Sequence, residues 1–168
     1  MTSAAVRLDH LDAIAFKVTS GSGHTVVIDG PAHIGGTDGG ARPMELVLAA
    51  LAGCAAVDVV HFLKKGRQTF TDLSVTATGH RVDAVPAVYD RIELAFTARG
   101  ALKADRFERA VGLAVDKYCS VRAMLNDEIE VLWSARVLDD GDGDGGGSGA
   151  GGGSGAGGGS GAGGGAAA

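Results

Sequence analysis

The chain has 168 residues, of which 45% are hydrophobic, and a formal net charge of −5. This acidic balance and the lack of a basic run argue against nucleic acid as a partner. The N-terminal sequence MTSAAVRLDHLDAIAF lacks the charged and then apolar layout of a signal peptide. We therefore expect a cytoplasmic protein, in which two cysteines are more often thiols or a redox pair than a structural disulfide.

The chain divides near residue 138. From Gly141 onward the sequence consists almost entirely of Gly, Ser and Ala, and the unit GGGSGA begins at residues 145, 151 and 157. Such a segment has no side chains to bury, so we expect residues 139–168 to form a disordered tail. Residues 1–138 are enough for one domain with a hydrophobic core.

The N-terminal part predicts a small sheet. Short alternating or β-branched runs over residues 4–8, 13–19 and 25–28 predict two or three antiparallel strands. The glycine-rich segment over residues 32–42 follows. It lacks the spacing of a phosphate-binding loop, and we interpret it as a flexible connection or a lid over a site.

The longest helical pattern is PMELVLAALAGCAAVDVVHFLKKGRQ, residues 43–68. Pro43 suits a first helical turn, and apolar residues on nearly every face are typical of a buried helix. At ~1.5 Å per residue, residues 43–65 would span roughly 34 Å, which is about the width of a small domain. One subunit can hardly cover such a helix, so we expect a second subunit. Asp58 and His61 interrupt the apolar run, which favours a buried helix over a membrane span.

The remaining segments complete the fold class. Residues 73–81 and 89–98 alternate as half-buried strands do, and residues 105–118 have the spacing of an amphipathic helix. We expect Ser120 to cap a short helix over residues 121–125, and residues 128–137 to form the last strand. Helices and strands are segregated, so the sequence predicts an α+β fold with helices packed on mainly antiparallel sheet.

The two cysteines are the candidate reactive residues. Cys54 lies in mid-helix, where a cysteine is more often a small buried hydrophobe than a nucleophile. Cys119 precedes a helix N-terminus, whose N–H groups would lower the pKa of a thiol. The helix wheel places Asp58 but no cation on the face of Cys54, so an activating group must come from elsewhere in the fold or from a second chain. The histidines show no metal-ligand spacing, and we expect no metal site.

Two segments resemble one known family. The helix motif quoted above is similar to the central helix of the OsmC/Ohr family, the osmotically inducible and organic hydroperoxide resistance proteins. DKYCSVRAML is similar to the second-cysteine motif of that family, and GHTVVIDG and the P-M-E-L start of the helix most resemble its YhfA-like branch. The resemblance covers nearly all of residues 1–138. It implies an OsmC-like α+β fold in an intertwined homodimer, with the two long helices at the centre.

The resemblance also implies a reaction. Cys54 would be the peroxidatic thiolate that reduces a small-molecule organic hydroperoxide, and Cys119 would resolve the resulting sulfenic acid as a disulfide. An external dithiol, rather than a bound cofactor, would regenerate the pair.

The resemblance is less complete around the cysteines. Glu45 is the nearest match to the carboxylate partner of the family, although it lies one position off, and the family arginine has no counterpart near Gly21. The expected substrate contacts are Leu51, Val47 and Arg42. These departures leave two alternatives, a non-catalytic OsmC-fold protein that binds an apolar small molecule at the dimer cleft, and a thiol redox sensor.

Overall fold

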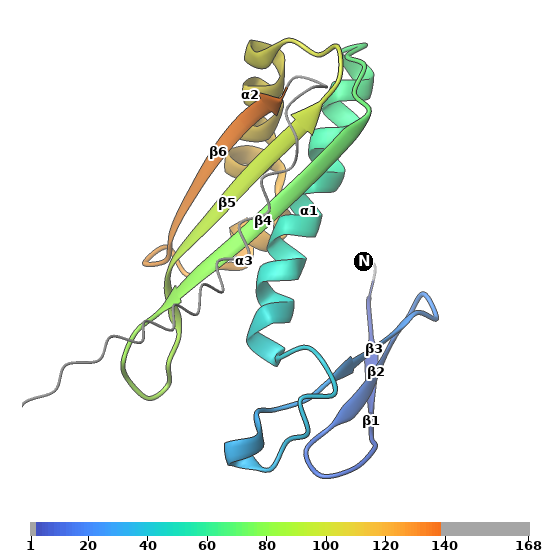
Figure 1. The fold of residues 1–168 in the computed structure, drawn as a ribbon, viewed down its shortest axis with the longest axis vertical. Coiled ribbons are helices and arrows are strands. Elements are labelled where there is room, and N and C mark those ends of the chain that lie inside the picture. The colour runs from blue at the N-terminus through green and yellow to red at the C-terminus, as the bar shows by residue number, and fades with distance from the viewer. Residues whose placement is uncertain (1–2, 139–168) are drawn as a thin grey trace, which may run out of the picture.

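The computed structural model describes residues 3–138, and the predicted tail lies outside the described residues (Figure 1). The chain has a mixed α+β architecture with two separate three-stranded sheets. In order, its elements are β1 (Val6–His10), β2 (Phe16–Ser20), β3 (Thr25–Ile28), η1 (Ala32–Ile34), α1 (Pro43–Lys65), β4 (Asp72–Arg81), β5 (Tyr89–Arg99), α2 (Ala104–Leu113), η2 (Ala114–Tyr118), α3 (Ser120–Met124) and β6 (Glu130–Leu138). The predicted order of helices and strands is confirmed.

The N-terminal sheet is an antiparallel meander in the order β1-β2-β3, at the end of the molecule where α1 begins (Figure 1). Leu8 pairs with Val18, and Val18 pairs with Val26. Paired residues point to the same face of a sheet, so these three side chains form an apolar face. Leu8 and Val26 are exposed within the single chain.

The second sheet has the order β4-β5-β6 and is packed against α1 and α2. β4 and β5 are antiparallel, as predicted, but β5 and β6 are parallel. Three of the four strand pairings are antiparallel, as expected of a mainly antiparallel sheet structure, and the last strand is the exception. The reason is the connection, because α2, η2 and α3 carry the chain from the end of β5 back to its start, which is the crossover that parallel strands require.

Helix α1 begins and ends where the sequence predicts. Only one stripe of it is fully buried within the chain, and that stripe consists of Leu51, Ala55, Val59 and Leu63. On the opposite face Val57 is 71% exposed. Among the described residues α1 is the one helix long and apolar enough to cross a membrane, by length and composition only. The core helix of a soluble protein passes the same test.

The region before Cys119 differs from the single predicted helix. α2 ends at Leu113, and η2 continues as a π-helical turn in which the Cys119 N–H donates to the Ala114 carbonyl over 2.8 Å. The N-cap of α3 is Cys119, not Ser120 as predicted, because the Cys119 Sγ accepts the Arg122 N–H. The π-turn therefore determines where the second thiol lies.

Candidate active site

The fold brings the two cysteines together, although 65 positions separate them in the sequence. Both are free thiols, with Cys54 half-buried in the middle of α1 and Cys119 almost fully buried. The Cys119 thiol lies 3.9 Å from the carbonyl oxygen of Leu51, one turn before Cys54 on α1. The Cys54 thiol is near enough to Cys119 to raise the pKa of the Cys119 thiol. The pair lies where α1 packs against η2 and α3.

Burial raises the pKa of the Cys119 thiol above its usual value. The Arg122 N–H, 3.4 Å from the sulfur, acts in the opposite direction because it stabilises the thiolate. The contact with Cys54 raises the pKa further, and the net direction is upward. The sequence predicted a lowered pKa from the helix N-terminus alone. At neutral pH Cys119 is therefore a neutral thiol.

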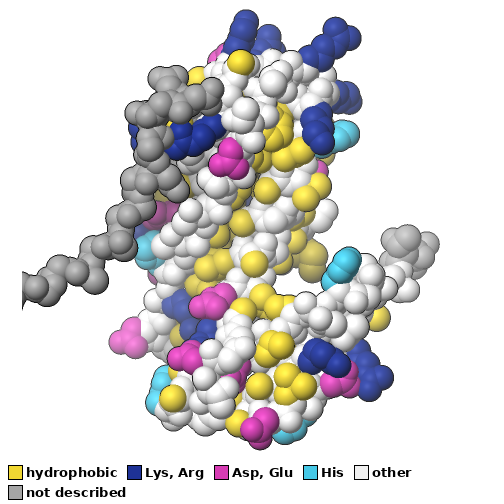
Figure 2. Space-filling view, turned by 45° about the vertical axis from the view of Figure 1, so that its right-hand side comes forward, with side chains coloured by type: hydrophobic (Ala, Val, Ile, Leu, Met, Phe, Trp, Pro, Cys, Tyr) yellow, Lys and Arg dark blue, Asp and Glu magenta, His cyan; other side chains and the backbone are white. Residues whose placement is uncertain are grey.

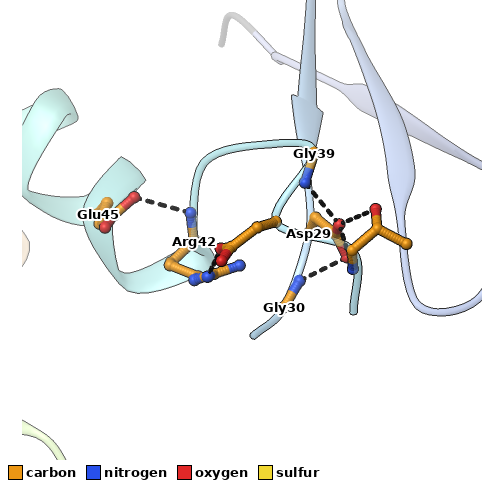
Figure 3. Close-up of polar contacts among 7 residues, drawn as sticks. Asp29, Gly30, Gly39, Arg42 and Glu45 are labelled. Atoms are coloured by element: carbon orange, nitrogen blue, oxygen red, sulfur yellow. Dashed lines mark hydrogen bonds and ion pairs between the residues drawn. The ribbon is translucent and has the colours of Figure 1, made fainter. Parts of the chain in front are cut away.

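Arg42 and Glu45 form the N-terminal cap of α1 (Figure 3). The Arg42 backbone N–H donates to the Glu45 carboxylate over 2.9 Å, and the Arg42 guanidinium forms an ion pair with Asp38. The Arg42 Nη1 is buried and has no hydrogen-bond partner among residues 3–138. Cys54 lies nine positions after Glu45, roughly 13 Å along the helix axis. Neither Arg42 nor Glu45 can therefore contact Cys54 of its own chain, and their predicted roles require a second chain.

The other predicted substrate contacts lie on α1 before Cys54 and differ in exposure. Val47 is half-buried, on the same side of α1 as Cys54. Leu51 is fully buried in the core, and its backbone carbonyl rather than its side chain contacts the thiol pair. Their role as substrate contacts stays a prediction. In the described part of the chain, no group of three His, Cys, Asp or Glu side chains could hold a metal ion.

Asp29 is a residue that sequence reasoning missed. Its side chain is buried and accepts hydrogen bonds from the N–H groups of Gly30, Thr37 and Gly39, at 2.7–2.9 Å, and from the Thr37 hydroxyl at 2.8 Å (Figure 3). These hydrogen bonds, led by that of Gly39, lower the pKa of the carboxyl far below its usual range. The glycine-rich segment is thus organised around one carboxylate, and is not the free connection expected from its composition.

A cavity of about 660 Å³ lies between the N-terminal sheet and the first turn of α1. Its lining is mainly apolar and includes Phe16, Ile34 and Met44, while Arg42 and Arg81 supply positive charge. Neither Cys54 nor Cys119 lines this cavity, so in the single chain it is separate from the thiol pair.

The family model described as OsmC-like protein matches residues 36–134, which contain both cysteines. The chain belongs to the OsmC family. A similar relative is "Protein YhfA" of Escherichia coli K12, with 38% identity over 133 residues that make up 79% of this chain and 96% of the relative. This agrees with the YhfA-like branch indicated by the sequence motifs.

Solved structures with the OsmC fold are also similar. A hypothetical protein from Aquifex aeolicus matches with a TM-score of 0.69 and 31% identity, over 82% of this chain and 99% of that one. The organic hydroperoxide resistance protein OhrB of Bacillus subtilis matches with a TM-score of 0.58 and 18% identity, over 80% of this chain and 98% of that one. The second match, at this identity, shows the common fold alone.

Proposed function

We propose that this OsmC-family protein reduces organic hydroperoxides through a two-thiol cycle of Cys54 and Cys119. The observation that carries the proposal is the proximity of the two thiols: Cys119 lies against the Leu51 carbonyl, one turn before Cys54 on α1, and the Cys54 thiol is near enough to raise the pKa of Cys119. Two free thiols close together are the arrangement that a two-thiol cycle requires. Neighbours with the same fold that are named organic hydroperoxide resistance proteins support the choice of oxidant.

The reaction would proceed in three steps. The Cys54 thiolate attacks the terminal oxygen of the hydroperoxide, the O–O bond breaks, and the released alkoxide takes a proton and leaves as an alcohol. The sulfur of Cys54 is now a sulfenic acid. Cys119 attacks this sulfur, a disulfide forms, and water leaves. An external dithiol then reduces the disulfide by two thiol–disulfide exchanges and becomes oxidised itself.

The different environments of the two thiols suit these two roles. Cys54 is partly exposed, so a peroxide can reach its sulfur. Cys119 is almost fully buried, and burial keeps it protonated at neutral pH. A protonated thiol is a poor nucleophile and resists direct oxidation, so Cys119 is suited to react second, with the sulfenic acid beside it.

We also propose that the working form is a homodimer in which α1 of a second copy covers the exposed face of α1. This face carries small residues, including Ala50, Gly53 and Val57, and a Cβ atom added at Gly53 would meet nothing within 4 Å in the single chain. Small residues allow two helices to approach closely. Figure 2 shows hydrophobic side chains exposed along the middle of the molecule and on the N-terminal sheet.

A second copy would also provide a source for the cation that the face of α1 carrying Cys54 does not supply. The pKa of Cys119 is determined by burial, by two backbone N–H groups and by Cys54. No cationic side chain of residues 3–138 is among these influences. Arg42 and Glu45 lie too far along their own helix to act on Cys54. Dimerisation is the way in which this chain could bring a charged first helical turn near a thiol pair.

The test is consumption of tert-butyl hydroperoxide by the full-length protein in the presence of a dithiol. The Cys54→Ser variant should consume no peroxide above the uncatalysed rate. The Cys119→Ser variant should react once and stop at the sulfenic acid, which a sulfenic-acid-specific reagent would label. Circular dichroism should show that both variants are folded. Turnover by Cys54→Ser at the wild-type rate would refute the thiol mechanism.

The cavity beside Arg42 favours a second candidate, the binding of an apolar small molecule without chemistry. It is mainly apolar, and Arg42 and Arg81, which line it, could hold a carboxylate group of a ligand. A pure binding protein would bind such a ligand equally well after Cys54→Ala, and wild-type protein would leave the hydroperoxide intact.

A further inference from the structure

One end of the molecule carries a cluster of basic side chains that the sequence does not reveal. The residues come from the end of α1 and from α2 with the segment before it, and they are Lys64, Lys65, Arg67, Lys103, Arg106 and Arg109. Figure 2 shows Lys and Arg side chains gathered at the upper end. Because two strands separate these segments in the sequence, no basic run appears there. The local charge is opposite to the net charge of −5.

Within residues 3–138, most of these side chains have no carboxylate partner. Arg106 lies 3.8 Å from Asp105, and both side chains are exposed. The structure records no ion pair for the other five among residues 3–138. Lys64 and Lys65 can be explained by the negative end of the α1 dipole. Arg106 lies in the first turn of α2, where the helix dipole disfavours a positive charge, so helix stability does not explain it.

A cavity of about 250 Å³ opens within this basic end, between α1 and α2. Its floor is apolar and consists of Phe62, Leu63, Ala110 and Leu113. Lys65, Arg106 and Arg109 line it as well, and no acidic side chain from the described part of the chain does. The two arginines are three positions apart on α2 and therefore share one side of the helix.

The cavity wall is fixed by a side chain that joins the two helical segments. The Gln68 side-chain oxygen, Oε1, accepts a hydrogen bond from the backbone N–H of Lys103 over 3.1 Å. The Gln68 side-chain nitrogen, Nε2, donates to the Gly66 backbone carbonyl over 3.2 Å. Gln68 also lines the cavity. The segment after α1 is thus held against the segment before α2, and the basic side chains extend from a defined backbone.

We propose that this cavity binds a small organic phosphate. The phosphate group lies between Lys65, Arg106 and Arg109, and a compact apolar body lies on the floor. Guanidinium groups bind phosphate oxygens in pairs, and three cations match a doubly negative group better than a singly charged carboxylate. Leu63 is nine residues after Cys54, roughly 13 Å along α1, so this site is separate from the thiol pair.

Phenyl phosphate is a suitable probe, because its ring matches the apolar floor. Isothermal titration calorimetry of the full-length protein, with NMR amide shifts to locate the site, should show binding that weakens as salt is added. Arg109→Gln should weaken the binding by about tenfold or more, since it removes charge-assisted hydrogen bonds. Lys17→Gln removes one charge from the N-terminal sheet and is the matched control, which should bind as wild type does.

Comparison ligands separate this proposal from a general attraction of anions. Inorganic phosphate lacks the apolar body, and benzoate lacks the second charge, so both should bind at least about tenfold more weakly than phenyl phosphate. No binding of phenyl phosphate by wild type, or equal binding by the Arg106→Gln/Arg109→Gln double variant, would overturn the proposal. So would inorganic phosphate that binds as tightly as phenyl phosphate. None of these results depends on the peroxidase activity.

Discussion

Replacing Val57 with serine should weaken the proposed homodimer. The Val57 side chain is 71% exposed in the single chain, and it lies on the small-residue face of α1 that we assign to the partner. Burying a whole valine side chain contributes about 1.5–3 kcal/mol, so burying its exposed part contributes about 1–2 kcal/mol. A two-fold interface contains the residue twice, which gives about 2–4 kcal/mol. The dimer dissociation constant should rise by about 30- to 1000-fold.

The assay is sedimentation equilibrium over a range of protein concentrations. The matched control is Val85→Ser, because Val85 is fully exposed in the loop between β4 and β5 and lies outside the proposed interface. This control should dissociate at the wild-type concentration. Thermal unfolding at high protein concentration should show that both variants still fold. A monomeric wild type, or equal dissociation constants for Val57→Ser and wild type, would refute the argument from the exposed helix face.

Three further predictions concern single groups. The rate of disulfide formation after peroxide addition, followed by stopped-flow, should rise about tenfold per pH unit up to the raised pKa of Cys119. The reason is that the thiolate form of Cys119 attacks the sulfenic acid of Cys54. A rate that does not change with pH would contradict this. Asp29→Asn should lower the thermal unfolding temperature at pH 7 and by clearly less at pH 2, where most of the stabilising effect of the ionised carboxyl has been lost. The reason is that a carboxyl with a depressed pKa contributes stability above its unfolded pKa and loses it as pH falls, so an equal effect at both pH values would exclude this role. Tyr89→Phe should lower the free energy of unfolding, measured by urea denaturation, by about 1 kcal/mol, because the Tyr89 hydroxyl donates to the Met44 carbonyl over 3.0 Å. An unchanged midpoint of denaturation would show that this hydrogen bond does not stabilise the fold.

The helix limits and the order of elements could be predicted because they depend on local signals. Pro43 marks the start of α1, and Gly66 marks its end. The direction of β6 could not be read in the same way. Its alternating sequence fits a parallel or an antiparallel neighbour, and the crossover through α2 decides between them.

The candidate site was predictable only in part. The family motifs identified Cys54 and Cys119, but neither spacing nor periodicity shows that η2 widens into a π-turn and places Cys119 against Leu51. The raised pKa of Cys119 depends on burial, which is a property of the packed chain. Asp29 was missed because its partners lie in a glycine-rich loop whose composition suggested mobility. An aspartate followed by such a loop, with a nearby threonine, was the available signal.

The most direct test of the central claim is thiol mapping by mass spectrometry. Full-length protein would be treated with one equivalent of tert-butyl hydroperoxide, alkylated and digested. The two-thiol cycle predicts that both free thiols disappear together and that one peptide pair contains Cys54 joined to Cys119 within a single chain. The Cys119→Ser variant should instead retain the oxidised Cys54 as a sulfenic acid. Two alkylatable thiols after treatment, or a disulfide only between separate copies, would contradict the account.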